Sequence, residues 1–182
     1  MADPRLDILI SNAAPPRDIE PFLKMSAETW DEDLAVNLTA SYLLGQRAGH
    51  VMKELGGGVI LYTASISAFG ASRGLASYCV TKAGIVSLVK SMALDLAPFG
   101  IRVNCVSPGP ADTQRSADLV GEEMMVKFRE SFAAVPMKRL ASADDVARAF
   151  VYLASEDAGY VTGHNLVVDG GLIAQIYEVP EA

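Results

Sequence analysis

The sequence is poor in the residues that usually build metal or redox centres. It contains two cysteines and two histidines in 182 residues. Cys79 and Cys105 lack the spacing of a metal or redox motif, and His50 and His164 stand apart from any cysteine or carboxylate cluster. We therefore expect no metal site, and we expect both cysteines to be small buried hydrophobic side chains in a reducing compartment.

Long apolar runs and positive charge are also scarce. Every apolar stretch is interrupted within a few residues, far short of the roughly 20 that span a bilayer, and the N-terminus has no apolar signal core. With 15 lysines and arginines against 22 aspartates and glutamates, the formal net charge is −7. Binding to phosphates needs a basic face, so we expect no nucleic acid and no membrane partner, and a cytoplasmic location.

What the sequence does contain is an alternation of short apolar strands and longer helices. Strands are predicted over residues 6–11, 59–63, 101–106 and 166–169. Helices are predicted from Ser26 or Thr29 to about residue 55, over 76–97, weakly over 115–135, and over 142–154. Strands that are apolar on both faces and alternate with helices form a parallel sheet covered on both sides. The length suits one ordinary domain, so we predict a single α/β domain over residues 1–182.

Four polar side chains are expected to converge at the carboxyl edge of this sheet. Tyr78 and Lys82 lie four positions apart on one predicted helix, so their side chains leave the same face. Ser65 follows the preceding strand, and Asn37 lies inside the preceding helix. Sites in parallel sheets form beyond the carboxyl ends of the strands, where these residues can meet.

The residue types suit the reduction of a carbonyl group. Hydride transfer to a carbonyl leaves an alkoxide that needs a proton, and a tyrosine hydroxyl can donate one. A lysine ammonium about 4 Å away favours the phenolate by roughly 4 kcal/mol at an effective dielectric constant of 20. Ser65 would orient the substrate oxygen, and Asn37 would hold a water that feeds protons to Lys82. A Tyr-x-x-x-Lys pair alone is common on helices, so the inference depends on its surroundings.

Those surroundings resemble the classical short-chain dehydrogenase/reductase family over essentially the whole chain. The matching segments are residues 7–14, 36–38, 65, 78–82, 102–109, 113 and 161–171. The resemblance implies a Rossmann-like three-layer α/β/α fold and an oxidoreductase that interconverts a secondary alcohol and a ketone with NAD or NADP. It implies Tyr78 as the acid/base, Lys82 as its activator and a ligand of the nicotinamide ribose, Ser65 as the substrate-orienting serine, and Asn37 as the relay asparagine.

The resemblance also assigns the cofactor contacts and the assembly. Besides Tyr78 and Lys82, the matching positions are Asn12, Ala13, Ala14, Pro108, Gly109, Ala111 and Thr113. The family's Asn-Asn-Ala-Gly turn reads Ser-Asn-Ala-Ala here. Members of the family usually associate through the helices that carry Asn37 and Tyr78, so a homodimer or homotetramer is implied. The pocket would include Met124, Met125 and Phe128 as an adaptable apolar lid, although ordinary core packing is the favoured explanation of such residues.

One part of the family pattern has no match. The family opens with a strand and a glycine-rich turn that cradles the cofactor pyrophosphate, whereas the glycines at 56–58 precede a strand. The residue that selects NAD or NADP has no match either, so that choice stays open. We expect the C-terminal portion of the fold, truncated at its N-terminal half, with residues 6–10 on an open sheet edge and weak cofactor binding by the chain alone.

Two functions remain open. The first is the oxidoreductase, and within this hypothesis the activity of a 3-oxoacyl carrier-protein reductase stays open. Lys82 disfavours halohydrin dehalogenases, which pair the tyrosine with an arginine, and the gap of three residues between Tyr78 and Lys82 disfavours enoyl reductases, which space the pair more widely. The second is a non-catalytic remnant that retains the fold and associates with a relative.

Overall fold

A single parallel sheet forms the centre of the molecule. The computed structural model describes residues 5–15 and 19–176; residues 1–4, 16–18 and 177–182, which the predicted domain includes, lie outside it. The strand order is β1-β2-β3-β4. The strands are β1 (Ile8–Ser11), β2 (Gly58–Thr63), β3 (Ile101–Pro108) and β4 (Asn165–Val168). All three pairings are parallel, which confirms the predicted sheet.

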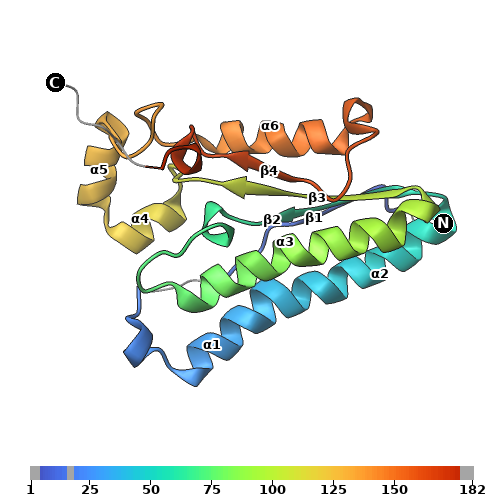
Figure 1. Cartoon of the computed structure of the whole chain (residues 1–182), viewed down its shortest axis with the longest axis horizontal. Coiled ribbons are helices and arrows are strands. Elements are labelled where there is room, and N and C mark those ends of the chain that lie inside the picture. The colour runs from blue at the N-terminus through green and yellow to red at the C-terminus, as the bar shows by residue number, and fades with distance from the viewer. Residues whose placement is uncertain (1–4, 16–18, 177–182) are drawn as a thin grey trace.

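Helices cover both faces of this sheet, as predicted. Figure 1 shows α1, α2 and α3 on one face, α6 on the other, and α4 and α5 beyond the carboxyl ends of the strands. The helices are α1 (Ala27–Asp33), α2 (Ala40–Leu55), α3 (Ala76–Leu96), α4 (Gln114–Val120), α5 (Glu122–Glu130) and α6 (Ala143–Ala154). A π-helical segment, Leu34–Thr39, joins α1 to α2.

Alternation along β2 explains why the central strands are apolar on both faces. Ile60 packs in the cluster that contains Ile85 of α3, whereas Leu61 packs in the cluster that contains Phe150 and Leu153 of α6. Successive side chains of a strand point to opposite faces. A strand covered by helices on both sides therefore needs apolar residues at every position.

Capping residues define the helix ends. Ser26 caps α1, because its Oγ accepts a hydrogen bond from the Thr29 backbone N–H at 3.0 Å, so Ser26 and not Thr29 begins the first helix. Ser142 forms a capping box with Asp145 at the start of α6, as its position predicted. Gly121, with φ of 86°, separates α4 from α5, so the weak helix predicted over 115–135 is two short helices.

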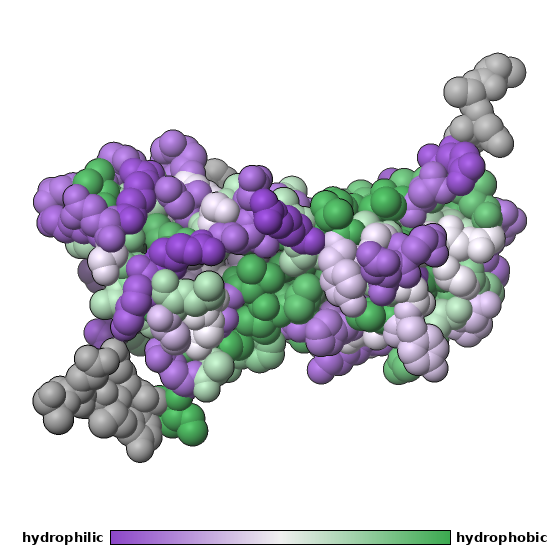
Figure 2. Space-filling view, turned by 90° about the horizontal axis from the view of Figure 1, so that it is seen from above, coloured by the Kyte–Doolittle hydropathy of each residue, from purple (hydrophilic) through white to green (hydrophobic). Residues whose placement is uncertain are grey.

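The surface contrasts an open strand edge with a polar end. β1 pairs with β2 and occupies the edge of the sheet, where Ile8 and Ile10 are 46% and 49% exposed. The predicted open edge is therefore present. Figure 2, which looks onto the molecule from the α6 side of Figure 1, shows apolar residues near the middle of this face and hydrophilic residues over the end that holds α5. In the described part of the chain, no helix is long and apolar enough to cross a membrane.

Candidate active site

Helix α3 and strand β2 together position Lys82. The lysine side chain lies inside the protein, with 3% of it exposed. Its Nζ donates a hydrogen bond to the Thr63 carbonyl at the end of β2, at 2.7 Å, and lies 5.4 Å from the centre of the Tyr78 ring. Tyr78 is half-buried one turn earlier on the same helix. The predicted pair therefore lies together at the carboxyl end of β2.

Ser65 lies on the short turn that follows β2. The residue is 7% exposed, and its Oγ accepts a hydrogen bond from the Ser67 backbone N–H at 3.1 Å. This turn, Ile66–Ala68, packs against α3. A serine hydroxyl that accepts from the backbone keeps its own hydrogen for another acceptor. Ser65 is thus held at the edge of the sheet that also receives the start of α3.

Asn37 lies in the π-helical segment and is almost fully buried, at 1% exposure. Its backbone carbonyl oxygen accepts a hydrogen bond from Ser41 Oγ at 2.7 Å, and its side-chain Nδ2 donates one to Asp33 Oδ1 at 3.0 Å. Its Oδ1 is buried and has no hydrogen-bond partner among the described residues. The segment packs on α3. Single turns of π-helix occur frequently at functional sites.

Asp33 is a buried acid that the sequence reading missed. It is 4% exposed, and its second carboxylate oxygen accepts a hydrogen bond from Ser77, the residue before Tyr78. A signal was present, because Asp33, Asn37 and Ser41 recur at intervals of four residues and so share one face of the helix.

The turn after β1 contacts the neighbouring strand and a distant helix. Thr63 Oγ1 donates a hydrogen bond to Asn12 Oδ1 at 2.6 Å, and Arg115 of α4 donates to the Ala14 carbonyl at 3.1 Å. Ala13, between them, is exposed. The predicted residues of this turn therefore lie beside the ends of β1 and β2, and Arg115 is an additional neighbour that sequence reasoning did not identify.

The loop after β3 borders the same edge from the other side. The Gly109 N–H donates to the Val168 carbonyl at 2.9 Å, and a Cβ on Gly109 would lie 2.7 Å from the Asp169 Cβ, so only glycine fits. Ala111 forms an isolated bridge with Ala141. Thr113 caps α4 by accepting from the Ser116 backbone N–H at 3.2 Å. Pro108 is the last residue of β3.

Asp169 has the structural role that its position suggested. Its two carboxylate oxygens accept from the backbone N–H groups of Gly171 and Ile173, at 2.9 and 2.8 Å. A carboxylate that caps two backbone donors stabilises a turn. The segment that directly follows β4 is therefore a turn stabilised by Asp169, and these hydrogen bonds account for this residue.

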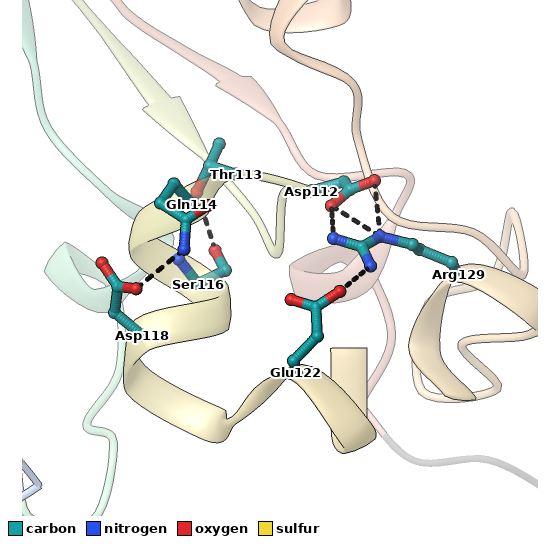
Figure 3. Close-up of polar contacts among 7 residues, drawn as sticks. All are labelled: Asp112, Thr113, Gln114, Ser116, Asp118, Glu122 and Arg129. Carbon is teal, nitrogen blue, oxygen red and sulfur yellow. Dashed lines mark hydrogen bonds and ion pairs between the residues drawn. The ribbon is translucent and has the colours of Figure 1, made fainter. Parts of the chain in front are cut away.

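Arg129 of α5 ties that helix to the loop after β3. Figure 3 shows its guanidinium between two carboxylates: Nε lies 3.0 Å from both oxygens of Asp112, and Nη1 lies 2.5 Å from Glu122 Oε1. Hydrogen bonds to these two carboxylates raise the pKa of Arg129 above its ordinary value. In the same view, Gln114 pairs with Asp118 at 2.9 Å. The loop and α5 are thus joined by charges at the surface.

The residues predicted to form an apolar lid divide between two roles. Met125 is 1% exposed and packs in a cluster with Ala117 and Leu140, with Phe128 against its edge. Met124 is 42% exposed. Core packing therefore accounts for Met125 and Phe128, and Met124 alone of the three faces solvent.

Other predicted features fall away from this edge. Cys105 is fully buried as expected, but Cys79 is partly exposed, because it follows Tyr78 on the accessible first turns of α3. The described residues contain no group of three or more potential metal ligands. Cavities of about 410 and 930 Å³ lie at the opposite end of the strands, and the predicted site residues line neither of them.

Comparison with known proteins gives consistent results. A family model described as enoyl-(acyl carrier protein) reductase matches residues 2–173. The 3-oxoacyl-[acyl-carrier-protein] reductase FabG of Aquifex aeolicus is 38% identical over 167 residues, which cover 92% of this chain. The L-rhamnose 1-dehydrogenase (NAD(P)(+)) of Azotobacter vinelandii is 38% identical over 172 residues, 94% of this chain.

A solved structure extends the similarity to three dimensions. The 7α-hydroxysteroid dehydrogenase in complex with NADH and 7-oxo glycochenodeoxycholic acid superposes with a TM-score of 0.82 at 32% identity, and the match covers 92% of this chain and 64% of that one. The matches cover 65% of the length of the Aquifex reductase and 66% of that of the rhamnose dehydrogenase. The chain thus spans about two thirds of the relatives that it matches.

Proposed function

Because the chain belongs to the short-chain dehydrogenase/reductase family, we propose that it serves the interconversion of a secondary alcohol and a ketone with NAD(H) or NADP(H). The observation that carries the proposal is the buried Lys82, 3% exposed, whose Nζ lies 5.4 Å from the Tyr78 ring centre. Burying an ammonium group is costly unless hydrogen bonds compensate it. Buried charged groups of this kind are often found at functional sites. Four relatives or models with oxidoreductase names, matched along most of this chain, support the same reaction class.

In this proposal the side chains share the proton chemistry. The Tyr78 hydroxyl donates its proton to the substrate oxygen during reduction and takes it back during oxidation. The Lys82 ammonium stabilises the phenolate, and its hydrogen bond to the Thr63 carbonyl fixes its place. Ser65 Oγ–H donates to the substrate oxygen, because its lone pair already accepts the Ser67 N–H. The nicotinamide supplies or accepts the hydride when it is bound.

The residues at the carboxyl edge fit the nicotinamide half of such a cofactor. Lys82 and Tyr78 offer a cation and a hydroxyl, the exposed Ala13 leaves space at the turn after β1, and the loop at residues 108–113 borders the other side. Within residues 5–15 and 19–176, no strand is followed by the Thr-Gly-x-x-x-Gly-x-Gly turn that would hold the pyrophosphate. The residue that selects NAD or NADP in the family has no match in the sequence either, so NAD and NADP remain equal candidates.

We further propose that the chain forms a single domain and that this domain self-associates. Helices α2 and α3, which carry the site residues or flank them, expose large apolar side chains: Tyr42 (46%), Leu44 (47%) and Val80 (47%). Apolar surface of this kind is typical of a subunit interface. A homodimer or homotetramer through these helices is expected, and light scattering after size-exclusion chromatography measures it.

The second candidate is a non-catalytic subunit that associates with a relative. The open edge of β1, with Ile8 and Ile10 about half exposed, favours it, because unpaired strand edges accept further strands. Its four proposed catalytic side chains would then be retained without turnover. Activity measurements separate the two candidates.

The test compares the wild type with Tyr78→Phe and, as a matched control, Tyr152→Phe, which removes a hydroxyl from the 43%-exposed tyrosine on α6. Each is assayed at 340 nm with millimolar NADH or NADPH and a 3-oxoacyl thioester or a keto steroid. We expect Tyr78→Phe to lower turnover by about 10²–10⁴-fold, while Tyr152→Phe retains it. Equal turnover in the two variants would remove Tyr78 from its role, and no turnover in any protein would favour the non-catalytic subunit.

A further inference from the structure

The buried carboxylate of Asp33 is a polar group in the described structure that the proposed chemistry leaves unexplained. Asp33 ends α1, is 4% exposed, and accepts hydrogen bonds from Asn37 Nδ2, at 3.0 Å, and from Ser77 Oγ. A buried carboxylate is costly unless such donors compensate it. Its two oxygens serve two different helical segments, so the same group ties the π-helical segment to the first turn of α3.

This contact decides which way the Asn37 amide points. Both Asp33 oxygens accept in this arrangement, Oδ1 from Asn37 and Oδ2 from Ser77, so the NH₂ group of Asn37 faces Asp33. The reversed amide would place one acceptor against another. Asn37 Oδ1 is therefore directed away from Asp33, where it is buried and has no donor among the described residues.

A buried acceptor of this kind calls for a donor. Buried polar groups are almost always hydrogen-bonded, to protein or to ordered water. The Asn37 carbonyl is already engaged by Ser41 Oγ at 2.7 Å, so the side-chain oxygen is the second acceptor of the same residue. Its position in a π-helical segment that packs on α3, the helix of Tyr78 and Lys82, places it next to the proposed proton chemistry.

We propose that Asp33 is a positioning residue, which orients the Asn37 amide so that Oδ1 accepts a hydrogen bond from a buried water on the proton path to Lys82. The same carboxylate holds Ser77, and with it the first turn of α3, in register with Asn37. The relay part of this inference rests on the proposed function. The orientation part rests on hydrogen bonds alone and can be tested separately.

The orientation is tested by the side-chain amide protons of asparagine. The chain has four asparagines, so asparagine-selective ¹⁵N labelling gives four NH₂ pairs. Asn104 is the internal control, because it is fully buried, and its Nδ2 donates to the Val161 carbonyl at 2.8 Å. We expect Asp33→Leu to speed hydrogen exchange of the Asn37 pair by about tenfold or more and to leave the Asn104 pair unchanged. Ser77→Ala, which removes the other arm, should change the Asn37 pair less than about threefold.

A conservative variant keeps the test decisive. In Asp33→Asn an amide oxygen can still accept from Asn37, so exchange should stay within about threefold of the wild type, although the Asn37 signals move upfield because a neutral acceptor binds more weakly. This shift carries the test if Asp33→Leu does not fold. An Asn37 pair that keeps its shift in Asp33→Asn and its exchange rate in Asp33→Leu would overturn the proposal.

Turnover separates a positioning role from a structural one. We expect Asp33→Leu to lower kcat by about 10–100-fold with unchanged KM for carbonyl and cofactor, and Asp33→Asn to restore kcat to within about threefold. Release of the Asn37 amide with unchanged kcat would show that Asp33 is only a structural tie. If the wild type has no turnover, the proposed function and the relay fail together, while the amide signals still decide whether Asp33 orients Asn37.

Discussion

The α3 side of the molecule and its α4–α5 end are held together in opposite ways. Asp33, Asn37 and Lys82 are each at most 4% exposed. Asn37 donates a hydrogen bond to Asp33, and Lys82 donates one to the backbone carbonyl at the end of β2. The charges that join α5 to the loop after β3 are at the surface, with Arg129 39% and Asp112 40% exposed. Buried polar contacts are little affected by salt, whereas exposed pairs are screened and contribute about 0–1 kcal/mol each.

This difference suits the carbonyl reduction proposed above. Groups that move protons act best when they are fixed before the substrate arrives. The α4–α5 end, which is held by exposed charges, is expected to belong to the less stable part of the structure. The account therefore predicts large effects on the α3 side and small ones at the α4–α5 end.

The largest effect is expected for Lys82→Met. It removes the buried ammonium and its hydrogen bond to the Thr63 carbonyl, so turnover should fall by about 10³-fold. Lys90→Met on the same helix is the matched control, because Lys90 is exposed and lines a cavity at the opposite end. Steady-state rates at 340 nm measure both. Equal activity of the two variants would mean that the buried lysine has no part in the chemistry.

A large loss of stability is expected for Asn104→Ala. Asn104 is fully buried, with Nδ2 donating to the Val161 carbonyl at 2.8 Å and Oδ1 accepting from the His164 N–H at 2.9 Å. Its removal leaves both backbone groups without partners, so the free energy of unfolding should fall by about 2–4 kcal/mol in urea.

The exposed end supplies the control for this measurement. Gln114→Ala removes the bond to Asp118 on α4 and should change the free energy of unfolding by less than about 0.5 kcal/mol. Similar losses in the two variants would mean that buried and exposed polar contacts contribute alike to the free energy of unfolding.

The two cysteines give a smaller, pH-dependent contrast. Burial raises the pKa of the Cys105 thiol to about 12, whereas Cys79 is partly exposed. A thiol reagent at pH 8 should modify Cys79 at least about tenfold faster than Cys105. Mass spectrometry of the modified peptides measures the ratio, and comparable rates would show that β3 is accessible.

The raised pKa of Cys105 predicts the direction in which the stability of the fold changes with pH. The folded protein keeps the Cys105 proton that the unfolded chain loses above the ordinary thiol pKa of 9.0. The folded state thus binds more protons between pH 9 and about 12, and its stability falls as the pH rises through this range. Cys105→Val should lessen that slope in urea titrations, and an unchanged slope would assign it to other groups.

The smallest effect is expected for Arg129→Gln. The change removes the contacts with Asp112 and Glu122, yet the free energy of unfolding should change by less than about 1 kcal/mol. Hydrogen exchange of the backbone over residues 122–130 should rise severalfold, and high salt should reproduce the rise in the wild type. Lys127→Gln, which removes a single exposed pair with Glu123, is the control. A global loss of stability would place α5 in the rigid part.

Much of the fold followed from local patterns. The strands apolar at every position predicted a sheet covered on both faces, and Ser142 with Asp145 predicted the start of α6. The positions of Tyr78 and Lys82 on one helix face likewise followed from their spacing. Local periodicity determines these features, because each depends on residues close together in the chain.

The rest depended on contacts between distant residues. Asp33 meets Ser77 across 44 positions, and Arg115 meets Ala14 across 101. An acidic residue in a helix usually faces solvent, and the four-residue spacing of Asp33, Asn37 and Ser41 shows that they share a face but not that this face is buried. The π-helical segment at Asn37 and the partial exposure of Cys79 also arise from how α3 packs.

The destination of the hydride tests the account most directly. The wild type is incubated with millimolar NADH or NADPH deuterated at C4, in either stereochemical form, and with each candidate ketone. The account predicts that one of the two stereochemical forms transfers one deuterium to the new carbinol carbon for each cofactor oxidised, in the wild type and in Tyr152→Phe and not in Tyr78→Phe. A wild type that yields no deuterated alcohol from any of these ketones would contradict it.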